Sequence, residues 1–114
     1  MREAMIICPT CTNDGADMSL IQRKAVAMMV DAFGGCTVTE AYGHWRNDAG
    51  EIMSEPVWQL VSAAVNGASA RSTLQDIARY VCDAGRQYCV YARMPDGEAI
   101  FVQPSQPIAA EAVA

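Results

Sequence analysis

The sequence predicts an α+β fold of the ferredoxin-like type, a βαββαβ unit plus an extra strand with two helices on one face of an antiparallel sheet. Two apolar stripes have helical spacing, and the segments around them are rich in β-branched or aromatic residues. Polar or Gly-containing turns separate these segments. We assign residues 1–104 to one ferredoxin-like domain and residues 105–114 to a flexible, Ala-rich tail.

The first half of the chain predicts a strand, a helix and a hairpin. A strand is expected at 5–8, and a helix should begin with a capping box at 19–22 and end at the glycines 34–35. Its apolar stripe is Ile21, Ala25, Met28, Met29 and Ala32. Two strands are expected at 36–45 and 51–65, joined by the polar turn 46–50. Pro56 interrupts the second strand, which predicts an edge or a bulge there.

The second half predicts a helix and a final pair of strands. A second capping box at 72–75 should open a helix that ends at Gly85. Its apolar stripe is Leu74, Ile77, Ala78, Val81 and Cys82. Strands are expected at 87–94 and 98–102, joined by the Pro-Asp-Gly turn at 95–97.

Composition and charge exclude several classes of protein. The net charge is −5 and the eight basic residues are scattered, which argues against a nucleic-acid partner. No segment reaches the roughly 20 apolar residues that cross a membrane, and residues 1–7 lack the apolar stretch of a signal peptide. The five cysteines are an odd number, so we expect reduced thiols in a cytoplasmic protein.

The strand around residues 57–61 has apolar side chains on both faces. Val57, Trp58, Leu60 and Val61 do not alternate cleanly with polar residues, whereas a sheet face exposed to water should alternate. The second face therefore needs a cover, and another subunit is the simplest one. The alternative is a monomer whose extra strand or tail folds over the sheet.

The histidine and the cysteines give no strong catalytic motif. His44 is the only histidine and lies beside aromatic residues, where a structural role is more common. No Ser or Cys elbow accompanies it, and no phosphate-binding Gly motif is present. Cys8 and Cys11 form a CxxC without two further zinc ligands nearby, so we interpret the cysteines as small apolar residues and keep a redox role open.

The carboxylates of the central hairpin are better candidates for a site. Glu51 and Glu55 flank Met53, and the two-residue period of a strand puts them on one face. Tyr42 on the preceding strand should lie across from this region. A carboxylate beside aromatic rings suits a cationic ligand such as a sulfonium or an ammonium group. The alternative is a solvated hairpin in which Glu51 pairs with Arg46.

The passage from the second helix to the next strand resembles a known family. Five residues have the spacing found in the S-adenosylmethionine (SAM) lyases of phages, historically called SAM hydrolases. They are Ala78, Arg79, Cys82, Gln87 and Cys89. A strand, a Gly-containing turn and a Glu that enters a Val-rich strand are also similar in order upstream. The resemblance covers roughly residues 19–103 and is dense over 78–91.

The resemblance implies a fold, an assembly and a reaction. It implies ferredoxin-like sandwiches that form homotrimers, with the substrate SAM held between subunits. The reaction is cleavage of SAM to 5′-methylthioadenosine and L-homoserine lactone, by attack of the substrate's own carboxylate on its γ-carbon. Such a reaction needs no metal, cofactor or covalent nucleophile. In a phage it would serve to evade host restriction, in the cytoplasm of the host cell.

The resemblance also implies roles for particular residues. The family's functional Glu corresponds to Glu55, with Glu51 as the alternative, and a family Tyr corresponds to Tyr42. We expect Glu55 and Tyr42 to be the catalytic pair. Trp58 and His44 are further substrate-binding candidates, and Trp45 or Trp58 would contact adenine or pack in the core.

Two other classes of function remain open at this point. Ferredoxin-like trimers of the PII-like and CutA-like types bind adenylates between subunits and do not consume them, although the short hairpin turn argues against this class. An acidic protein with net charge −5 also suits an interaction protein that antagonises a host enzyme.

Overall fold

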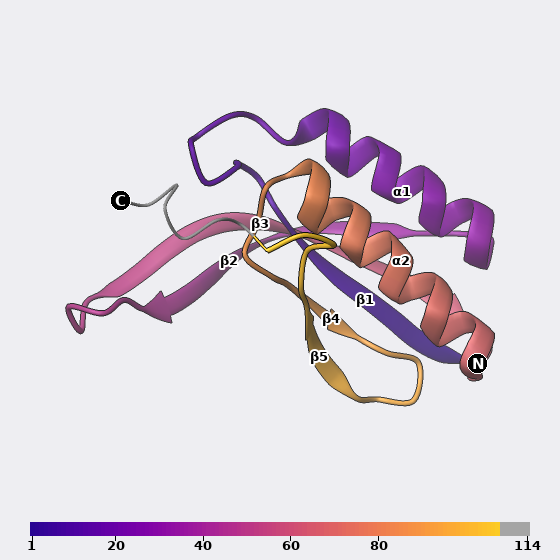
Figure 1. Ribbon diagram of the computed structural model, residues 1–114. Helices are drawn as coiled ribbons and strands as arrows, with labels where there is room; N and C mark the ends of the chain where they lie inside the picture. The colour runs from indigo at the N-terminus through magenta and orange to yellow at the C-terminus, as the bar shows by residue number, and fades with distance from the viewer. Residues whose placement is uncertain (108–114) are drawn as a thin grey trace.

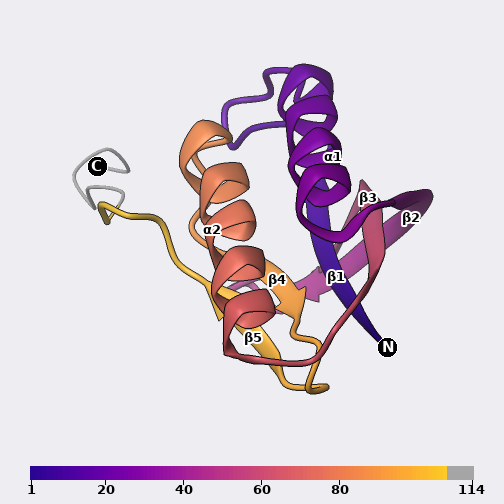
Figure 2. The same cartoon turned by 90° about the vertical axis from the view of Figure 1, so that its right-hand side faces the viewer.

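The computed structural model describes residues 1–107, and the rest of the predicted tail, 108–114, lies outside the described residues. The elements in order are β1 (Arg2–Pro9), α1 (Ser19–Phe33), β2 (Thr37–Arg46), β3 (Ile52–Ala64), α2 (Ala68–Ala84), β4 (Val90–Arg93) and β5 (Ala99–Val102). The five strands form one sheet in the order β2-β3-β1-β4-β5, and every pairing is antiparallel. Both helices lie on one face of this sheet (Figures 1 and 2). The predicted ferredoxin-like α+β fold with an extra strand is confirmed.

The core lies between the helices and the sheet. Alternate residues of the central strands point towards the helices because side chains alternate across a strand, so Ile6 of β1 and Leu60 of β3 are paired and fully buried. The predicted stripe of α2 is buried throughout. On α1, Ala25 and Met29 are buried, whereas Ala32, which we had placed in the stripe, is exposed.

Neither predicted capping box forms: α1 begins at Ser19 as expected but without a side-chain cap, whereas α2 begins at Ala68, before its expected cap. The N-cap of α1 is Met18, and Ser19 is already helical, with its hydroxyl donating to the Asp17 carboxylate at 2.9 Å. The N-cap of α2 is Gly67, which puts Ser72 inside the helix. The predicted end of α1 is confirmed, since Gly34 has the left-handed conformation with φ of 90° and donates to the Val30 carbonyl.

The end of α2 differs from the prediction in one respect. Gly85 ends the helix as expected, but the left-handed position is taken by the next residue, Arg86, with φ of 51°. The Gln87 backbone N–H then donates to the Cys82 carbonyl at 2.9 Å, which closes the helix end as a Schellman motif. The following strand begins at Val90 and not at 87, so residues 87–89 form a loop.

The β2–β3 hairpin extends beyond the rest of the sheet (Figure 1). The ladder between β1 and β3 ends with the pair Pro9 and Val57, whereas β2 and β3 stay paired as far as Arg46 and Ile52. Pro56 lies one residue past the end of the β1 ladder, so its missing N–H is at a local edge, as predicted. The register runs unbroken through Pro56, and the alternative of a bulge is wrong.

The sheet face away from the helices also has apolar side chains. Val57 and Val61 lie on it, and Met5 of β1 is paired with Val61. On the same face Tyr91 and Phe101 form an edge-to-face pair with centroids 5.6 Å apart, and Phe101 is largely exposed. The expected apolar character of both faces is therefore present, and its cover by a second copy stays a prediction. Within residues 1–107, no helix is long and apolar enough to cross a membrane.

Candidate functional site

Glu55 lies in a cavity beside the base of the projecting hairpin. It stands on β3 opposite Gly43 of β2, and its side chain is half-buried. The cavity has a volume of about 420 Å³, within the range of small-molecule sites. Its lining residues are Cys11, Thr12, Asn13, Trp45, Glu55, Gln87, Tyr88 and Cys89.

Burial raises the pKa of the Glu55 carboxyl above its ordinary value. No cation of the described chain offsets this effect, because the two ion pairs found there are both made by Arg71. A carboxylate in such a place is short of a positive partner, and a cationic ligand would supply one.

Trp45 supplies an aromatic face to the same cavity. It is paired with Met53, which lies two residues before Glu55 on the same side of β3. The Trp45 side chain is about half exposed, so its ring is open to a ligand. A carboxylate and an indole on one wall form the combination that binds cations through charge and through the ring face.

Two loops complete the cavity, and side-chain hydrogen bonds hold them together. The β1–α1 loop gives residues 11–13, and the α2–β4 loop gives residues 87–89. The buried Gln87 amide donates to the Cys11 carbonyl at 3.3 Å and to the Gly85 carbonyl at 3.0 Å. The Asn13 amide donates to the Arg86 carbonyl at 2.7 Å. These bonds fix the two loops against each other.

The end of β1 is attached directly beside Glu55. The Thr10 hydroxyl donates to the Pro56 carbonyl at 2.9 Å, past the last β1–β3 pair. This bond continues the contact between the two segments for one more residue. It therefore places the β1–α1 loop against the part of β3 that holds Glu55.

Tyr42 and His44 do not meet Glu55 within one chain. Tyr42 is paired with Pro56 and His44 with Ser54, whereas Glu55 is paired with Gly43. Directly paired residues share a face, so the side chains of Tyr42 and His44 are on the opposite side of the hairpin from Glu55. Both are exposed, and the Tyr42 side chain is 71% accessible.

Glu51 and Trp58 also lie outside this cavity. Glu51 is in the hairpin turn, where its backbone N–H donates to Asn47 Oδ1 at 2.9 Å and its carboxylate accepts from Asn47 Nδ2 at 3.3 Å. Its alternative pairing with Arg46 is not formed, because the Arg46 guanidinium donates to the Gly50 carbonyl. Trp58 is half-buried and packs against the hydrophobic core.

Most of the cavity wall comes from residues that no sequence pattern marks as a site. Two loops that are distant in sequence supply this part of the wall, and no local pattern brings them together. Their residues are Cys11, Gln87, Tyr88 and Cys89. Trp45 had been named beside Trp58 as a residue to contact adenine or to pack, and the hairpin register puts it on the same face as Glu55.

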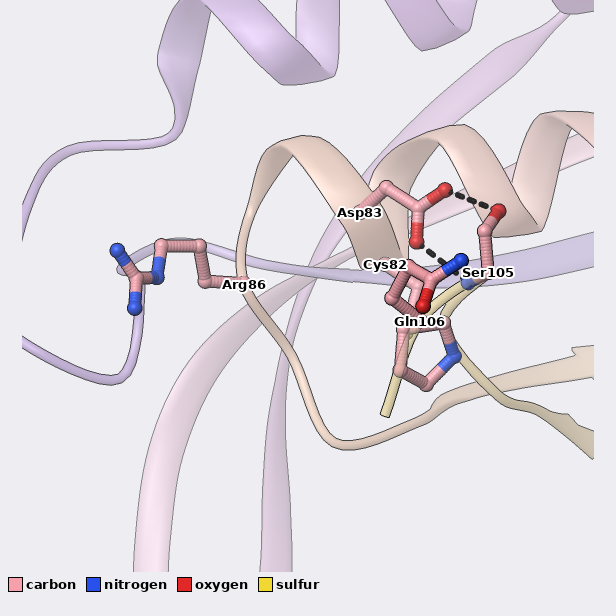
Figure 3. Close-up of a pocket in the computed structure, with 6 residues that line it drawn as sticks. Cys82, Asp83, Arg86, Ser105 and Gln106 are labelled. Atoms are coloured by element: carbon pink, nitrogen blue, oxygen red, sulfur yellow. Dashed lines mark hydrogen bonds between the residues drawn. The ribbon is translucent and has the colours of Figure 1, made fainter. Parts of the chain in front are cut away.

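A second hollow beside α2 holds none of the predicted site residues. Its volume is about 270 Å³, and its lining residues are Cys82, Asp83, Arg86, Pro104, Ser105 and Gln106. The Asp83 carboxylate accepts two hydrogen bonds from Ser105, one from the hydroxyl at 2.6 Å and one from the backbone N–H at 2.8 Å (Figure 3). These bonds lower the pKa of Asp83 and attach the start of the predicted tail to α2. The Arg86 side chain points away from the other labelled residues (Figure 3).

Comparisons with known proteins identify a structural likeness. No family model matches the sequence, and no curated protein matches it. A phage SAM lyase in complex with S-methyl-5′-thioadenosine has a TM-score of 0.71 at 10% identity, over 93% of this chain and 92% of that chain. A phage SAM lyase in the apo state has a TM-score of 0.68 at 10% identity, over 93% and 91%. The chain thus has the fold of these phage SAM lyases, and the resemblance in the sequence is confirmed at the level of fold.

Proposed function

We propose that this chain is a SAM lyase that cleaves SAM to 5′-methylthioadenosine and L-homoserine lactone. The observation that supports this most directly is the half-buried Glu55 carboxylate beside Trp45, which has no cationic partner among residues 1–107. The likeness in fold adds weight, because a solved structure of that fold holds S-methyl-5′-thioadenosine.

The reaction needs orientation more than chemical groups. A substrate carboxylate oxygen attacks the γ-carbon, the C–S bond breaks, and its electron pair stays on sulfur as a neutral thioether. No proton, metal or protein nucleophile takes part in this step. The protein has to fold the methionine part so that the carboxylate is in line with the breaking bond. It also has to remove water from the sulfonium, whose positive charge decreases on the way to the transition state.

Glu55 and Trp45 suit the two tasks. In the proposed site the Glu55 carboxylate binds the substrate ammonium group and thereby fixes the methionine part. The cationic sulfonium or ammonium also finds a favourable electrostatic surface on the indole ring. Of the two tryptophans expected to contact the adenine or to pack, Trp45 lines the proposed site, whereas Trp58 packs against the core.

Tyr42 enters this scheme through a second copy of the chain. Its side chain points away from Glu55 on the same hairpin, so a Tyr42 hydroxyl could orient the substrate only from another subunit. A homotrimer with sites between subunits, which the resemblance implies, would bring such groups together. His44 lies on the same side as Tyr42 and is a candidate for the same shared site, whereas Glu51 in the turn is a weaker one.

The activity should fall on the acid side at a pH above the ordinary glutamate pKa. The folded chain holds the Glu55 proton more tightly than the unfolded chain, because burial raises the pKa. As the pH falls through that raised pKa, the carboxylate that binds the substrate is lost. The free energy of unfolding depends on pH in the opposite direction. Between the Glu55 pKa of the unfolded chain and the higher one of the folded chain, the folded chain binds more protons. The free energy of unfolding therefore declines as the pH rises through that window.

The initial rate of SAM cleavage measured against pH checks this prediction. An acid limb with its midpoint above the ordinary glutamate value agrees with it. A rate that stays constant down to and below that value would contradict a role for the Glu55 carboxylate.

Incubation of the purified protein with SAM tests the proposed function. We expect 5′-methylthioadenosine to accumulate in the presence of EDTA, as resolved by chromatography and mass spectrometry. SAM that stays intact at high protein concentration would refute the enzyme. Binding of an adenylate such as ATP without turnover would then favour the PII-like or CutA-like class of ligand-binding trimers.

A further inference from the structure

Two of the five cysteines line the cavity of Glu55, and they come from different loops. Cys11 follows β1 and Cys89 precedes β4, and both are exposed. The Gln87 side chain donates to the Cys11 carbonyl and lies two residues from Cys89, so one buried residue holds both cysteine loops. The cavity therefore has two thiols on its wall, in addition to its carboxylate and its indole.

The other cysteines are in different surroundings. Cys8 and Cys82 are buried, and desolvation raises the pKa of Cys8 to about 12 and that of Cys82 to about 11. Cys36 is half-buried near the end of α1, and burial raises its pKa as well. Since the thiolate is the reactive form and an oxidant has to reach it, these three cysteines are protected.

We propose that Cys11 and Cys89 are sites at which a low-molecular-weight disulfide modifies the protein and closes the cavity of Glu55. The proposal rests on the proposed function for its consequence, since the closed cavity is the proposed SAM site. The cysteine positions themselves do not depend on that function.

The chemistry is thiol–disulfide exchange. The cysteine thiolate attacks one sulfur of the small disulfide, a new S–S bond forms, and the disulfide's own S–S bond breaks. The departing thiolate takes up a proton, so the protein thiol is oxidised and half of the small disulfide is reduced. The added group then extends from the wall into a cavity of about 420 Å³, beside Glu55 and Trp45. A reducing thiol reverses the step by the same exchange.

Glutathione disulfide is the probe for the experiment. We expect peptide mapping to place glutathionyl groups on Cys11 and Cys89, and we expect dithiothreitol to remove them. Binding of S-methyl-5′-thioadenosine, measured by calorimetry, should weaken by about tenfold or more in the modified protein. The Cys11→Ser/Cys89→Ser variant should not respond to the probe, whereas Cys36→Ser, outside the cavity, should respond as the wild type does.

A second readout does not depend on SAM chemistry. The chain has two tryptophans, so the Trp58→Phe variant leaves Trp45 on the cavity wall as the only indole. Glutathionylation should lower the quenching of its fluorescence by acrylamide, because the added group covers the ring. This readout and the peptide map still judge the proposal if the protein neither binds methylthioadenosine nor cleaves SAM, an outcome that would refute only the proposed function.

Three results would overturn the proposal. The first is modification at Cys36, Cys8 or Cys82 in preference to the cavity thiols. The second is full modification of Cys11 and Cys89 with unchanged acrylamide quenching of Trp45. The third is a Cys11–Cys89 cross-link in place of the adducts, because a cross-link adds no group to the cavity.

Discussion

Glu55→Gln is expected to lower kcat/KM for SAM by about 100-fold, the usual size of the loss when one preorganised electrostatic group is removed. The amide keeps the shape of the side chain but removes the charge that would hold the substrate ammonium in place. Because Glu55 is half-buried and forms no ion pair with the part of the chain that the structure describes, the neutral amide should not destabilise the fold. Steady-state kinetics with SAM and the thermal unfolding of the variant check the two parts of this expectation.

Glu40→Gln is the matched control for this prediction. Glu40 is exposed on the same hairpin, and its pairing with Trp58 places it on the opposite face from Glu55. Its substitution removes the same charge and should leave the kinetics unchanged. If both variants lose activity equally, the effect comes from the overall charge; if neither does, Glu55 has no place in the site.

Leu60→Ala should lower the free energy of unfolding by about 2–5 kcal/mol, as is usual for a large-to-small change in a core. Leu60 is fully buried at the centre of β3, paired with Ile6 on one side and Val38 on the other. Both neighbouring strands are held in the sheet, so the structure cannot close readily around the missing atoms. Urea unfolding followed by circular dichroism measures the effect.

Val38→Ala is the control for this substitution. Val38 is the cross-strand partner of Leu60 and points to the same face of the sheet. It lies on the edge strand β2, however, and is 38% accessible. Its truncation should cost only about 0.5 kcal/mol. Equal effects for the two variants would contradict the assignment of the core to the space between β3 and the helices.

The fold could be predicted because its signals are repeated along the chain. The α2 stripe and the strand patterns each depend on many side chains, so one misleading residue does not change the outcome. The starts of the helices depend on single residues: α1 begins at Ser19 as predicted, but neither capping box forms and α2 begins at Ala68, before Ser72. Ser19 and Ser72 have the sequence of a capping box, but the N-cap positions are taken by the buried Met18 and by Gly67.

The site could be predicted only in part, for reasons of register. Glu55 was a candidate because a charge at the entry to an apolar strand is a local signal and because the family resemblance placed the functional Glu there, and the structure puts it in a cavity. Its partner was not, since a shift of one residue in a hairpin moves a side chain to the other face. The observed register puts Gly43 opposite Glu55 and turns Tyr42 away, whereas Trp45 shares its side. The loops with Gln87 and the two thiols meet through tertiary contacts that the sequence does not reveal.

We propose that the substrate's own carboxylate cleaves SAM, and isotope labelling tests this mechanism most directly. The reaction is run in ¹⁸O-labelled water and followed by NMR and mass spectrometry. Intramolecular attack predicts L-homoserine lactone without label as the first product beside 5′-methylthioadenosine, with ¹⁸O entering only the carboxyl group as the lactone hydrolyses. Homoserine that appears at once with ¹⁸O in its hydroxyl group would mean that water attacks the γ-carbon, and it would contradict the account.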